Sequence, residues 1–158
     1  MNDISQIDLA RLAAYVESEG GMYLTHSMVT HRGHRLLRTS PKMMVSNTDI
    51  RLLDWCQRIT GIGSINKVGK RDHPRWKQGY AWHCYARNAI YLAKQMLPYF
   101  VIKREQAEVL IAYERLILSS NVSNKGVRPD NQEQRVHLVS QMRVLNRRGN
   151  ADDKGKAS

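Results

Sequence analysis

Apolar residues recur at helical intervals near the start of the chain. The recurring positions are Ile7, Leu9, Leu12, Tyr15 and Val16. A period of three to four residues is typical of an amphipathic helix. Ser5 followed by Asp8 is a start signal, and Gly20-Gly21 is a stop signal. The pattern therefore predicts a helix that ends just after Glu19.

The pattern then changes to alternation, which is typical of half-buried strands. The first run sets Met22, Leu24 and Met28 against Tyr23, Thr25 and Ser27. The second run sets Arg38, Ser40 and Lys42 against Pro41, Met43 and Val45. Between the two runs, His31-Arg32-Gly33-His34 has the composition of a turn. We predict a β-hairpin whose polar face is basic.

A helix and a second hairpin follow. Thr48 is a good N-cap for a periodic apolar run that ends at Gly61. The strands of the second hairpin are expected over 62–68 and 80–87, and a long basic connection joins them. This part repeats the order of the first: one helix, then two strands.

Three further helices complete the predicted fold. A helix capped by Asn88 runs through Leu97 and is stopped by Pro98, and two more cover 103–118 and 131–146. Four antiparallel strands with helices on one face make a two-layer α+β fold. The length of 158 residues suits one domain, over 1–146, followed by a disordered basic and polar tail over 147–158.

The other face of the sheet must meet solvent or a partner, and its side chains are donors, acceptors and cations. These are Tyr23, Thr25, Ser27, Arg38, Ser40, Lys42, Ser64, Asn66, Lys70, Tyr80 and Trp82. Such groups at strand spacing suit a curved sheet lying in the major groove of DNA. A merely solvated face would also alternate, but the absence of acids weighs against that alternative.

The charge of the chain favours a polyanionic partner. The net charge is +11 and the pI is about 10.0. Residues 21–104 hold fifteen Lys or Arg and only three acids, so this segment accounts for the excess. Double-stranded DNA is the simplest partner, and a membrane surface is the weaker alternative. Phosphate contacts are expected from Arg32, Arg35, Lys70, Arg71, Arg75 and Lys77, although the last four would also suit a solvated loop.

Cysteine and histidine give no sign of a metal centre or of secretion. Cys56 and Cys84 form no CxxC pair, which favours reduced thiols in an intracellular protein located with the DNA, in cytoplasm, nucleoid or organelle. The sequence has no signal peptide and no apolar run of membrane-spanning length. His26, His31 and His34 could be taken for a zinc site, but DNA-facing or core roles fit better because no cysteine or carboxylate lies beside them.

Two features of the first helix are unusual. Glu17 and Glu19 face the negative end of the helix dipole, so another cause, such as a bound cation, must favour them. The helix also carries a stripe of small residues where a core helix usually has Leu or Ile. The stripe comprises Ala10, Ala13, Ala14 and Ser18. Small side chains allow a second helix to approach closely.

Residues 12–20, Leu-Ala-Ala-Tyr-Val-Glu-Ser-Glu-Gly, resemble the motif of the LAGLIDADG homing endonucleases, with Ala14 in place of Gly. An amphipathic helix that ends Glu-x-Glu-Gly-Gly by chance is the alternative. Two more segments resemble the family in the expected order: 45–49, leading into a helix, and 97–103, with its Pro-aromatic start and terminal Lys103. The three matches span most of residues 7–118.

The resemblance implies an αββαββα fold with a saddle-shaped sheet, and a metal-dependent endonuclease. One motif copy implies a homodimer in which paired first helices meet through Ala10, Ala13, Ala14 and Glu17. The implied metal ligand for Mg²⁺ or Mn²⁺ is Glu19, helped by the carbonyl of Gly20 or a neighbour. Glutamate replaces the commoner aspartate there.

The family pattern also places Asn47, Arg51 and Lys103 around an attacking water, although each also suits an ordinary surface role. Glu17 is favoured as a structural acid over a metal helper. The function implied is cleavage of a long pseudo-palindromic DNA site, as in intron homing, with no membrane or small-molecule substrate. A catalytically inactive DNA-binding regulator and an RNA-splicing, maturase-like protein remain alternatives.

Overall fold

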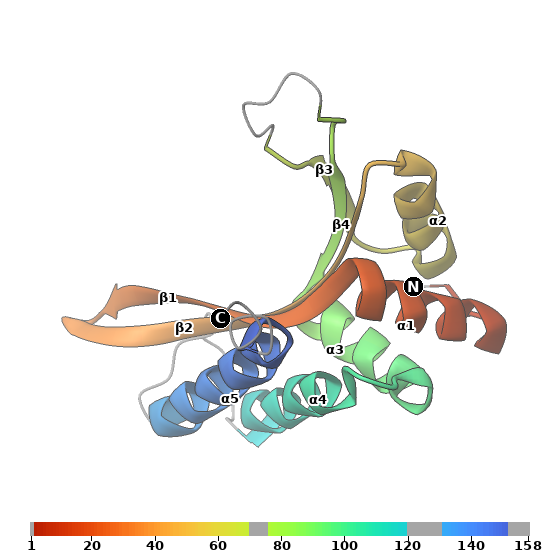
Figure 1. The fold of residues 1–158 in the computed structure, drawn as a ribbon. Coiled ribbons are helices and arrows are strands. Elements are labelled where there is room, and N and C mark those ends of the chain that lie inside the picture. The colour runs from red at the N-terminus through yellow and green to blue at the C-terminus, as the bar shows by residue number, and fades with distance from the viewer. Residues whose placement is uncertain (1, 70–75, 120–130, 152–158) are drawn as a thin grey trace.

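A four-stranded antiparallel sheet in the order β1-β2-β4-β3 organises the protein, and the helices cover one of its faces (Figure 1). The computed structural model describes residues 2–69, 76–119 and 131–151. Figure 1 shows the β1-β2 hairpin reaching to one side and β3 and β4 rising from the centre, so the sheet is curved. The predicted α+β fold is confirmed.

The long hairpin is built as the alternation predicts. Strand β1, Gly20–His31, pairs along its length with β2, His34–Asn47. The two residues between them, Arg32 and Gly33, both have positive φ, 48° and 81°. A two-residue turn of this kind matches the twist of the strands that it joins. The second half of β2 also pairs with β4, Tyr80–Tyr85, which pairs with β3, Ser64–Lys67.

The helices differ from the predicted ones mainly at their ends. They are α1 Gln6–Glu19, α2 Ile50–Thr60, α3 Ala86–Met96, the 3-10 turn η1 Leu97–Tyr99, α4 Arg104–Ser119 and α5 Gln132–Ala151. The cap of α1 is confirmed, because the Ser5 hydroxyl accepts a hydrogen bond from the Asp8 N–H at 3.1 Å. The predicted cap of α2 is wrong by one residue. The side chain of Asp49, and not that of Thr48, accepts a hydrogen bond from the Arg51 N–H in the first turn. Helix α5 extends past Asn146, into the segment expected to be a tail.

The predicted start of α3 at Asn88 is also wrong. Strand β4 passes directly into α3 at Ala86, whose φ is 54°, and Tyr85 is the cap residue without a side-chain cap bond. The sharp backbone turn at Ala86 replaces the polar cap that the sequence led us to expect. Arg87, expected at the strand end, and Asn88, expected as the cap, therefore lie in the first turn of the helix.

The core lies between the sheet and the helices, and α1 crosses its centre. Leu12, Ala13 and Val16 of α1 are fully buried, as are Met43 and Val45 of β2 and Trp82 of β4. Fixing α1 against the middle of the sheet places its C-terminal end where β1 begins. The acidic end of α1 is therefore held rigidly next to the sheet.

Helix α5 supports the outer half of β2, which has no strand partner on that side. The Gln132 side chain accepts a bond from the Leu37 N–H at 2.7 Å and donates to the Leu37 carbonyl at 3.3 Å. The buried Arg135 guanidinium donates to Thr39 Oγ1 at 3.0 Å and to Tyr113 Oη at 2.8 Å. These contacts fix the hairpin against the helices.

The two thiols are unreactive. Cys56 and Cys84 are both free and buried, and burial raises the pKa of each to about 12. As for membranes, none of the helices in the described ranges combines the length and the apolarity that a span requires.

Candidate active site and nucleic-acid interface

The C-terminal end of α1, called here the α1 foot, comprises residues 16–20. It is tied to the start of α4 by the Glu17 carboxylate. Oε1 of Glu17 accepts hydrogen bonds from the N–H groups of Val101, Ile102 and Lys103 at 2.8, 2.7 and 3.0 Å. These N–H groups precede or begin α4, where free donors and the helix dipole favour an anion. Glu17 is thus a structural acid within its own chain, whereas the expectation placed it at the interface of paired first helices.

The side chain of Lys103, just before α4, also binds the end of α1. Its Nζ donates to the carbonyl of Val16 at 3.1 Å and to that of Gly20 at 2.8 Å. A cation at these carbonyls satisfies the negative end of the helix. Burial lowers the pKa of the half-buried Lys103, and the nearby Glu17 charge partly opposes that shift. The expectation that Lys103 reaches the region of the acidic tip agrees with this geometry.

Glu19 is the acid that the α1 foot leaves available. Its side chain is exposed, and no hydrogen bond or ion pair joins it to another residue of the described part of the chain. It directly precedes Gly20, which begins β1. A Cβ at Gly20 would stand 2.0 Å from the Met44 carbonyl oxygen, so only glycine permits this approach to β2. The absence of a side chain at position 20 therefore lets the backbone at the end of α1 lie directly against β2.

A cavity of about 820 Å³ opens beside the α1 foot. Gly20, Tyr23, Lys103, Arg104 and Asn146 are among the residues that line it. Asn146 donates from Nδ2 to the Met22 carbonyl at 3.2 Å, which joins α5 to the wall. The basic side chains of Lys103 and Arg104 outnumber the one acid of the lining, Glu105, so the cavity has a net basic wall.

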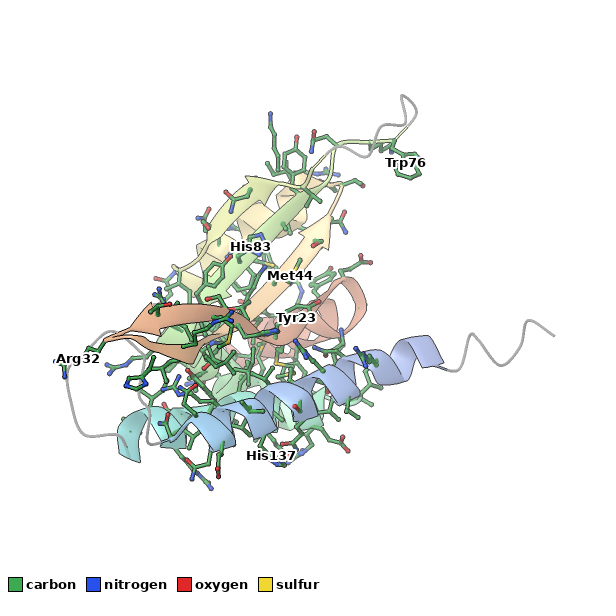
Figure 2. The ribbon with its side chains drawn as sticks, turned by 90° about the vertical axis from the view of Figure 1, so that its left-hand side faces the viewer. Tyr23, Arg32, Met44, Trp76, His83 and His137 are labelled. Carbon is green, nitrogen blue, oxygen red and sulfur yellow. The ribbon has the colours of Figure 1, made fainter. Side chains whose placement is uncertain are left out.

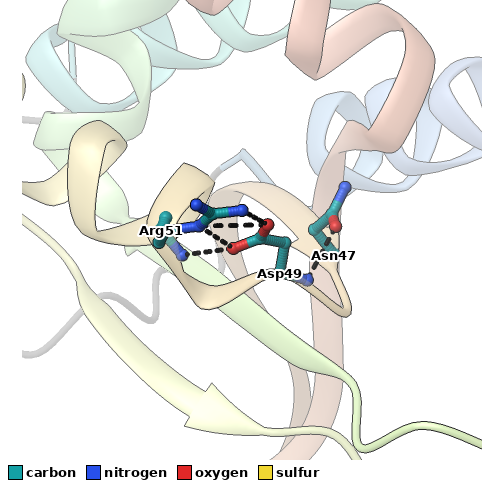
Figure 3. A network of polar contacts seen from close by, with 3 residues as sticks. All are labelled: Asn47, Asp49 and Arg51. Atoms are coloured by element: carbon teal, nitrogen blue, oxygen red, sulfur yellow. Dashed lines mark hydrogen bonds and ion pairs between the residues drawn. The ribbon is translucent and has the colours of Figure 1, made fainter.

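Asn47, Asp49 and Arg51 form a second cluster, at the start of α2 (Figure 3). Asn47 Oδ1 accepts from the Asp49 N–H at 2.8 Å, and Asp49 binds the Arg51 guanidinium with its shortest contact at 2.6 Å. The Arg51 hydrogen bonds lower the pKa of Asp49 to about 2. Arg51 is 87% exposed, so the cluster is a surface arrangement.

The strand register relates the two clusters. Gly20 pairs with Val45, and Asn47 lies two residues farther along β2, on the same side of the strand as Val45. Asn47 therefore lies near the α1 foot. In the described ranges, however, no hydrogen bond or ion pair links the Asn47 cluster to Glu17, Glu19 or Lys103. The structure brings Lys103 to the foot and leaves Arg51 bound to Asp49.

The open face of the sheet, meaning the face without helices, carries half of the sixteen predicted nucleic-acid residues, six of them in cross-strand pairs. Tyr23 lies opposite Lys42, Thr25 opposite Ser40 and Ser27 opposite Arg38. Ser64 and Asn66 of β3 are exposed on the same face. Figure 2 shows Tyr23, Met44 and His83 along the sheet, and Arg32 at the tip of the hairpin. Donors and acceptors thus form a continuous surface across four strands.

The sequence analysis assigned the wrong face of β4 to the open side of the sheet. Trp82 is fully buried in the core, and its indole N–H donates to the Ile62 carbonyl at 3.0 Å. Tyr80, on the same face of the strand, is half-buried against the core. A one-residue change of register exchanges the two faces of a strand. Trp82 therefore cannot contact DNA from this fold.

On β4 the open face carries His83 and Tyr85 in place of Trp82 and Tyr80. The sequence analysis missed both residues. Their rings stack with centroids 6.1 Å apart, and the Lys42 ammonium lies 5.7 Å from the Tyr85 ring centroid. His83 Nδ1 is buried without a hydrogen-bond partner among the described residues. Burial lowers the pKa of His83, and Lys42 lowers it further, so the imidazole is neutral at pH 7. The face of His83 is set by its pairing with Met44 and Ser64, which no pattern within the strand predicts.

The remaining basic residues are distributed over several surfaces. Arg32 and Lys77 are exposed, at the hairpin tip and before β4. Arg35 lies opposite Thr30, on the other face of β2 from Arg38, because side chains three residues apart alternate. Lys70, Arg71 and Arg75 lie outside the described residues.

The four residues predicted to lie at a dimer contact differ in their exposure and contacts. Ala14 is exposed and Ala10 is half-buried. Ala13 is fully buried in the core of its own chain, and Glu17 binds the start of α4. The exposed stripe of α1 consists instead of Ile7, which is 74% exposed, with Ala10, Arg11 and Ala14. Ala13 was thus placed on the wrong side of the helix.

The α1 foot offers only a partial set of ligands for a cation. No group of three His, Cys, Asp or Glu side chains that could hold a metal occurs among the residues that the structure describes. The foot supplies one free carboxylate, Glu19, and the carbonyl oxygen of Gly20. Hard oxygen donors fit Mg²⁺, which commonly takes one or two carboxylates and completes its shell with waters and phosphates. The donor set therefore fits such a cation if further oxygens come from outside the chain.

Comparison with solved structures identifies the fold. I-CvuI bound to its target in the presence of Ca matches with a TM-score of 0.61 and 21% identity, over 89% of this chain and 82% of that one. The group I intron-encoded I-CeuI, complexed with DNA, matches with a TM-score of 0.61 and 12% identity, over 90% and 69%. I-SmaMI, bound to an uncleaved DNA target with calcium, matches with 0.56 and 15%, over 88% of this chain and 45% of that one.

These proteins are homing endonucleases, so the chain has the fold of the LAGLIDADG homing endonucleases, as the resemblance implied. No protein-family model matches the chain, and no curated protein sequence does so significantly.

Proposed function

We propose that the protein is a homing endonuclease. In this proposal a homodimer binds a long pseudo-palindromic site in double-stranded DNA and makes a double-strand break with Mg²⁺ or Mn²⁺. The fold and the DNA complexes of the similar structures support the DNA-binding part of the proposal. The I-CvuI complex with Mg holds its DNA uncleaved, so cleavage with a metal rests on the α1 foot of this chain. An enzyme of this kind acts inside the cell, where the DNA is.

The observation that carries the proposal is the free carboxylate of Glu19. Most acids at a helix C-terminus are unfavourable, and Glu17 is explained by its three N–H partners. Glu19 has no such partner in the described chain and directly precedes Gly20, which lines the cavity. An acid retained there without a structural contact suits the binding of a cation next to DNA.

The incomplete ligand set supports a homodimer. One carboxylate and one carbonyl per chain leave most of the shell of a divalent ion to waters and phosphates, and a second copy related by a two-fold axis would add a second carboxylate beside the first. The chain spans 45% of I-SmaMI but 82% of I-CvuI, so among the similar structures its length is nearer to that of I-CvuI. The exposed stripe of α1, with Ile7, Ala10 and Ala14, is the surface that we assign to the contact between copies.

The open face provides the contacts to DNA. Lys42 and Arg38 supply cations, and Thr25, Ser27 and Ser40 supply hydroxyls at strand spacing. His83 and Tyr85 extend this surface over β4. Many such partial contacts would together specify a long site.

The chemistry assigned to the chain follows from the α1 foot. Glu19 and the Gly20 carbonyl would hold a divalent cation, which supplies charge neutralisation at the phosphate and a more acidic water. Lys103 stabilises negative charge that develops on the phosphate. Asn47, near the foot through the strand register, orients a water with its amide. Arg51 could contact the phosphate only after its ion pair with Asp49 is broken.

A second candidate function is a DNA-binding regulator, or a maturase-like RNA-splicing protein, that has lost cleavage. The second cluster favours it, because Asn47 and Arg51 both bind Asp49 and not the α1 foot. Glutamate at position 19 also lengthens the acidic arm relative to aspartate. Binding would then remain while the reaction is lost.

The test begins by selecting duplexes from a randomised library with the protein in Ca²⁺. The selected duplexes are then incubated with Mg²⁺ and either the wild type, Glu19→Gln or Glu133→Gln. Glu133 is an exposed acid of α5, so Glu133→Gln removes the same charge away from the foot. We expect all three proteins to bind, and only Glu19→Gln to lose cleavage, by at least about a hundredfold.

Two other outcomes decide against parts of the proposal. Binding by all three proteins without cleavage by any supports the regulator. Cleavage by Glu19→Gln at the wild-type rate would remove the assigned role of Glu19. Light scattering of the same samples reports the number of chains in solution, and a monomer that cleaves both strands would exclude the homodimer.

A further inference from the structure

Lys103 makes two contacts that a surface lysine does not need. Its ammonium group bridges the carbonyls of Val16 and Gly20, which are 87 and 83 residues away in the sequence. Both carbonyls belong to the α1 foot, where the helix dipole is negative. The position that Lys103 occupies is therefore a cation position at the end of α1.

The backbone of Lys103 is fixed independently of its side chain. The Glu17 carboxylate binds the N–H of Lys103 at 3.0 Å and those of the two preceding residues. A lysine with a mobile backbone would extend its ammonium into water. The anchoring by Glu17 directs the half-buried side chain back toward the foot instead.

We propose that the Lys103 ammonium is an internal counter-cation that holds the α1 foot in the metal-free protein and competes with a divalent metal for the Gly20 carbonyl. This inference rests on the proposed function, because that function assigns the carbonyl to the metal. Two cations that approach one oxygen repel each other strongly in a partly desolvated site. Metal binding must therefore displace the ammonium from Gly20.

Displacement gives Lys103 two successive roles. While the foot is without metal, Lys103 stabilises the helix end and keeps the Gly20 carbonyl satisfied. Once displaced, the ammonium faces the cavity that Lys103 and Arg104 line, where a phosphate would lie. The same side chain thus couples the arrival of the metal to the binding of the phosphate.

Arg104 provides a matched control. It carries the same charge one residue later and lines the same cavity, but it pairs with Glu108 at 3.3 Å and does not contact the foot. Arg104→Met and Lys103→Met therefore change the net charge equally. Only Lys103→Met removes the cation from the Val16 and Gly20 carbonyls.

The experiment titrates each purified, full-length protein with Mn²⁺ and follows the electron paramagnetic resonance signal of the free hydrated ion. We expect Lys103→Met to bind Mn²⁺ about fivefold more tightly than Arg104→Met, since only the former removes the competing cation. We also expect Lys103→Met to unfold at a lower temperature than Arg104→Met without metal, and added Mn²⁺ to recover more of that loss. Lys103→Gln keeps a donor without the charge, so it serves for the titration if Lys103→Met does not fold.

The outcomes separate this inference from the proposed function. If Glu19→Gln abolishes Mn²⁺ binding but the Lys103 and Arg104 variants have equal affinity, the metal site stands and the competition is overturned. Weaker binding by Lys103→Met than by Arg104→Met also overturns it, because the lysine would then assist the metal. If the wild type does not bind Mn²⁺, or binds it as Glu19→Gln does, both the inference and the assigned metal site fail.

Discussion

The two polar clusters near the end of α1 are built in opposite ways. The α1 foot joins Glu17 and Gly20 to residues 101–103, more than 80 positions away, through contacts to backbone groups that are exposed at Val101 and Ile102 and half-buried at Lys103. The second cluster lies within residues 47–51, and Arg51 there is 87% exposed. Both clusters were expected to serve one reaction pocket.

This difference indicates how each cluster can respond to a ligand. Backbone donors and carbonyls of the foot are fixed by α1 and α4, so its geometry is available before anything binds. The ion pair of Asp49 and Arg51 is exposed, and such pairs contribute little to stability. Arg51 can therefore exchange Asp49 for a phosphate without disturbing the fold. The foot is a preformed part of the site, and the second cluster is an adjustable one.

The largest effect is expected from Glu17→Ala. The change leaves three N–H groups at the start of α4 without their charged acceptor, so we expect a loss of about 3 kcal/mol in the free energy of unfolding. Urea denaturation measures the loss. Glu17→Gln, which keeps an acceptor oxygen, should lose about half as much. If Glu17→Ala is as stable as Glu108→Ala, an exposed acid on α4, the foot is not held by this contact.

An intermediate effect is expected from Gly20→Ala. Its Cβ would meet the Met44 carbonyl at 2.0 Å, and the backbone there cannot yield without separating β1 from β2. We expect a loss of about 2 kcal/mol in thermal or urea unfolding. Gly33→Ala at the hairpin tip, where nothing lies within 4 Å of an added Cβ, isolates the effect of positive φ alone. A Gly20→Ala protein of wild-type stability would show that the close approach is not required.

The smallest effect is expected from Asp49→Asn, and it should depend on pH. The pKa of Asp49 is about 2 in the fold, against 3.8 for the free side chain, because Arg51 donates to its carboxylate. A lowered pKa stabilises the fold above pH 3.8, and that stabilisation disappears as the pH falls through about 2. The difference in unfolding free energy between wild type and Asp49→Asn should therefore shrink across this range. Parallel curves for the two proteins would show that the ion pair does not form in solution.

Sequence reasoning predicted the parts of the fold that depend on local pattern. The period of α1, the alternation of β1 and β2 and the turn at Arg32-Gly33 are all confirmed. It failed in β4, where the run Tyr-Ala-Trp-His-Cys-Tyr offers no clear alternation. The face of Trp82 is set by distant partners, the Ile62 carbonyl and the neighbouring strands. No pattern within β4 contains that information.

The candidate site was also predicted only where it depends on local sequence. The resemblance of residues 12–20 and 97–103 located both sides of the α1 foot. It could not show that Glu17 binds the loop before α4, since that contact depends on how two helices pack. The burial of Ala13 similarly depends on which stripe of α1 meets the sheet, because both stripes contain small residues.

The two deeply buried thiols have a practical consequence. With pKa values of about 12, Cys56 and Cys84 remain protonated and are shielded from alkylating reagents at neutral pH. A cysteine introduced at the exposed Ala14 would thus be the sole reactive sulfur, since the chain has only these two natural ones. Spin labels or bifunctional maleimides attached there could measure how far apart the α1 helices of neighbouring molecules lie.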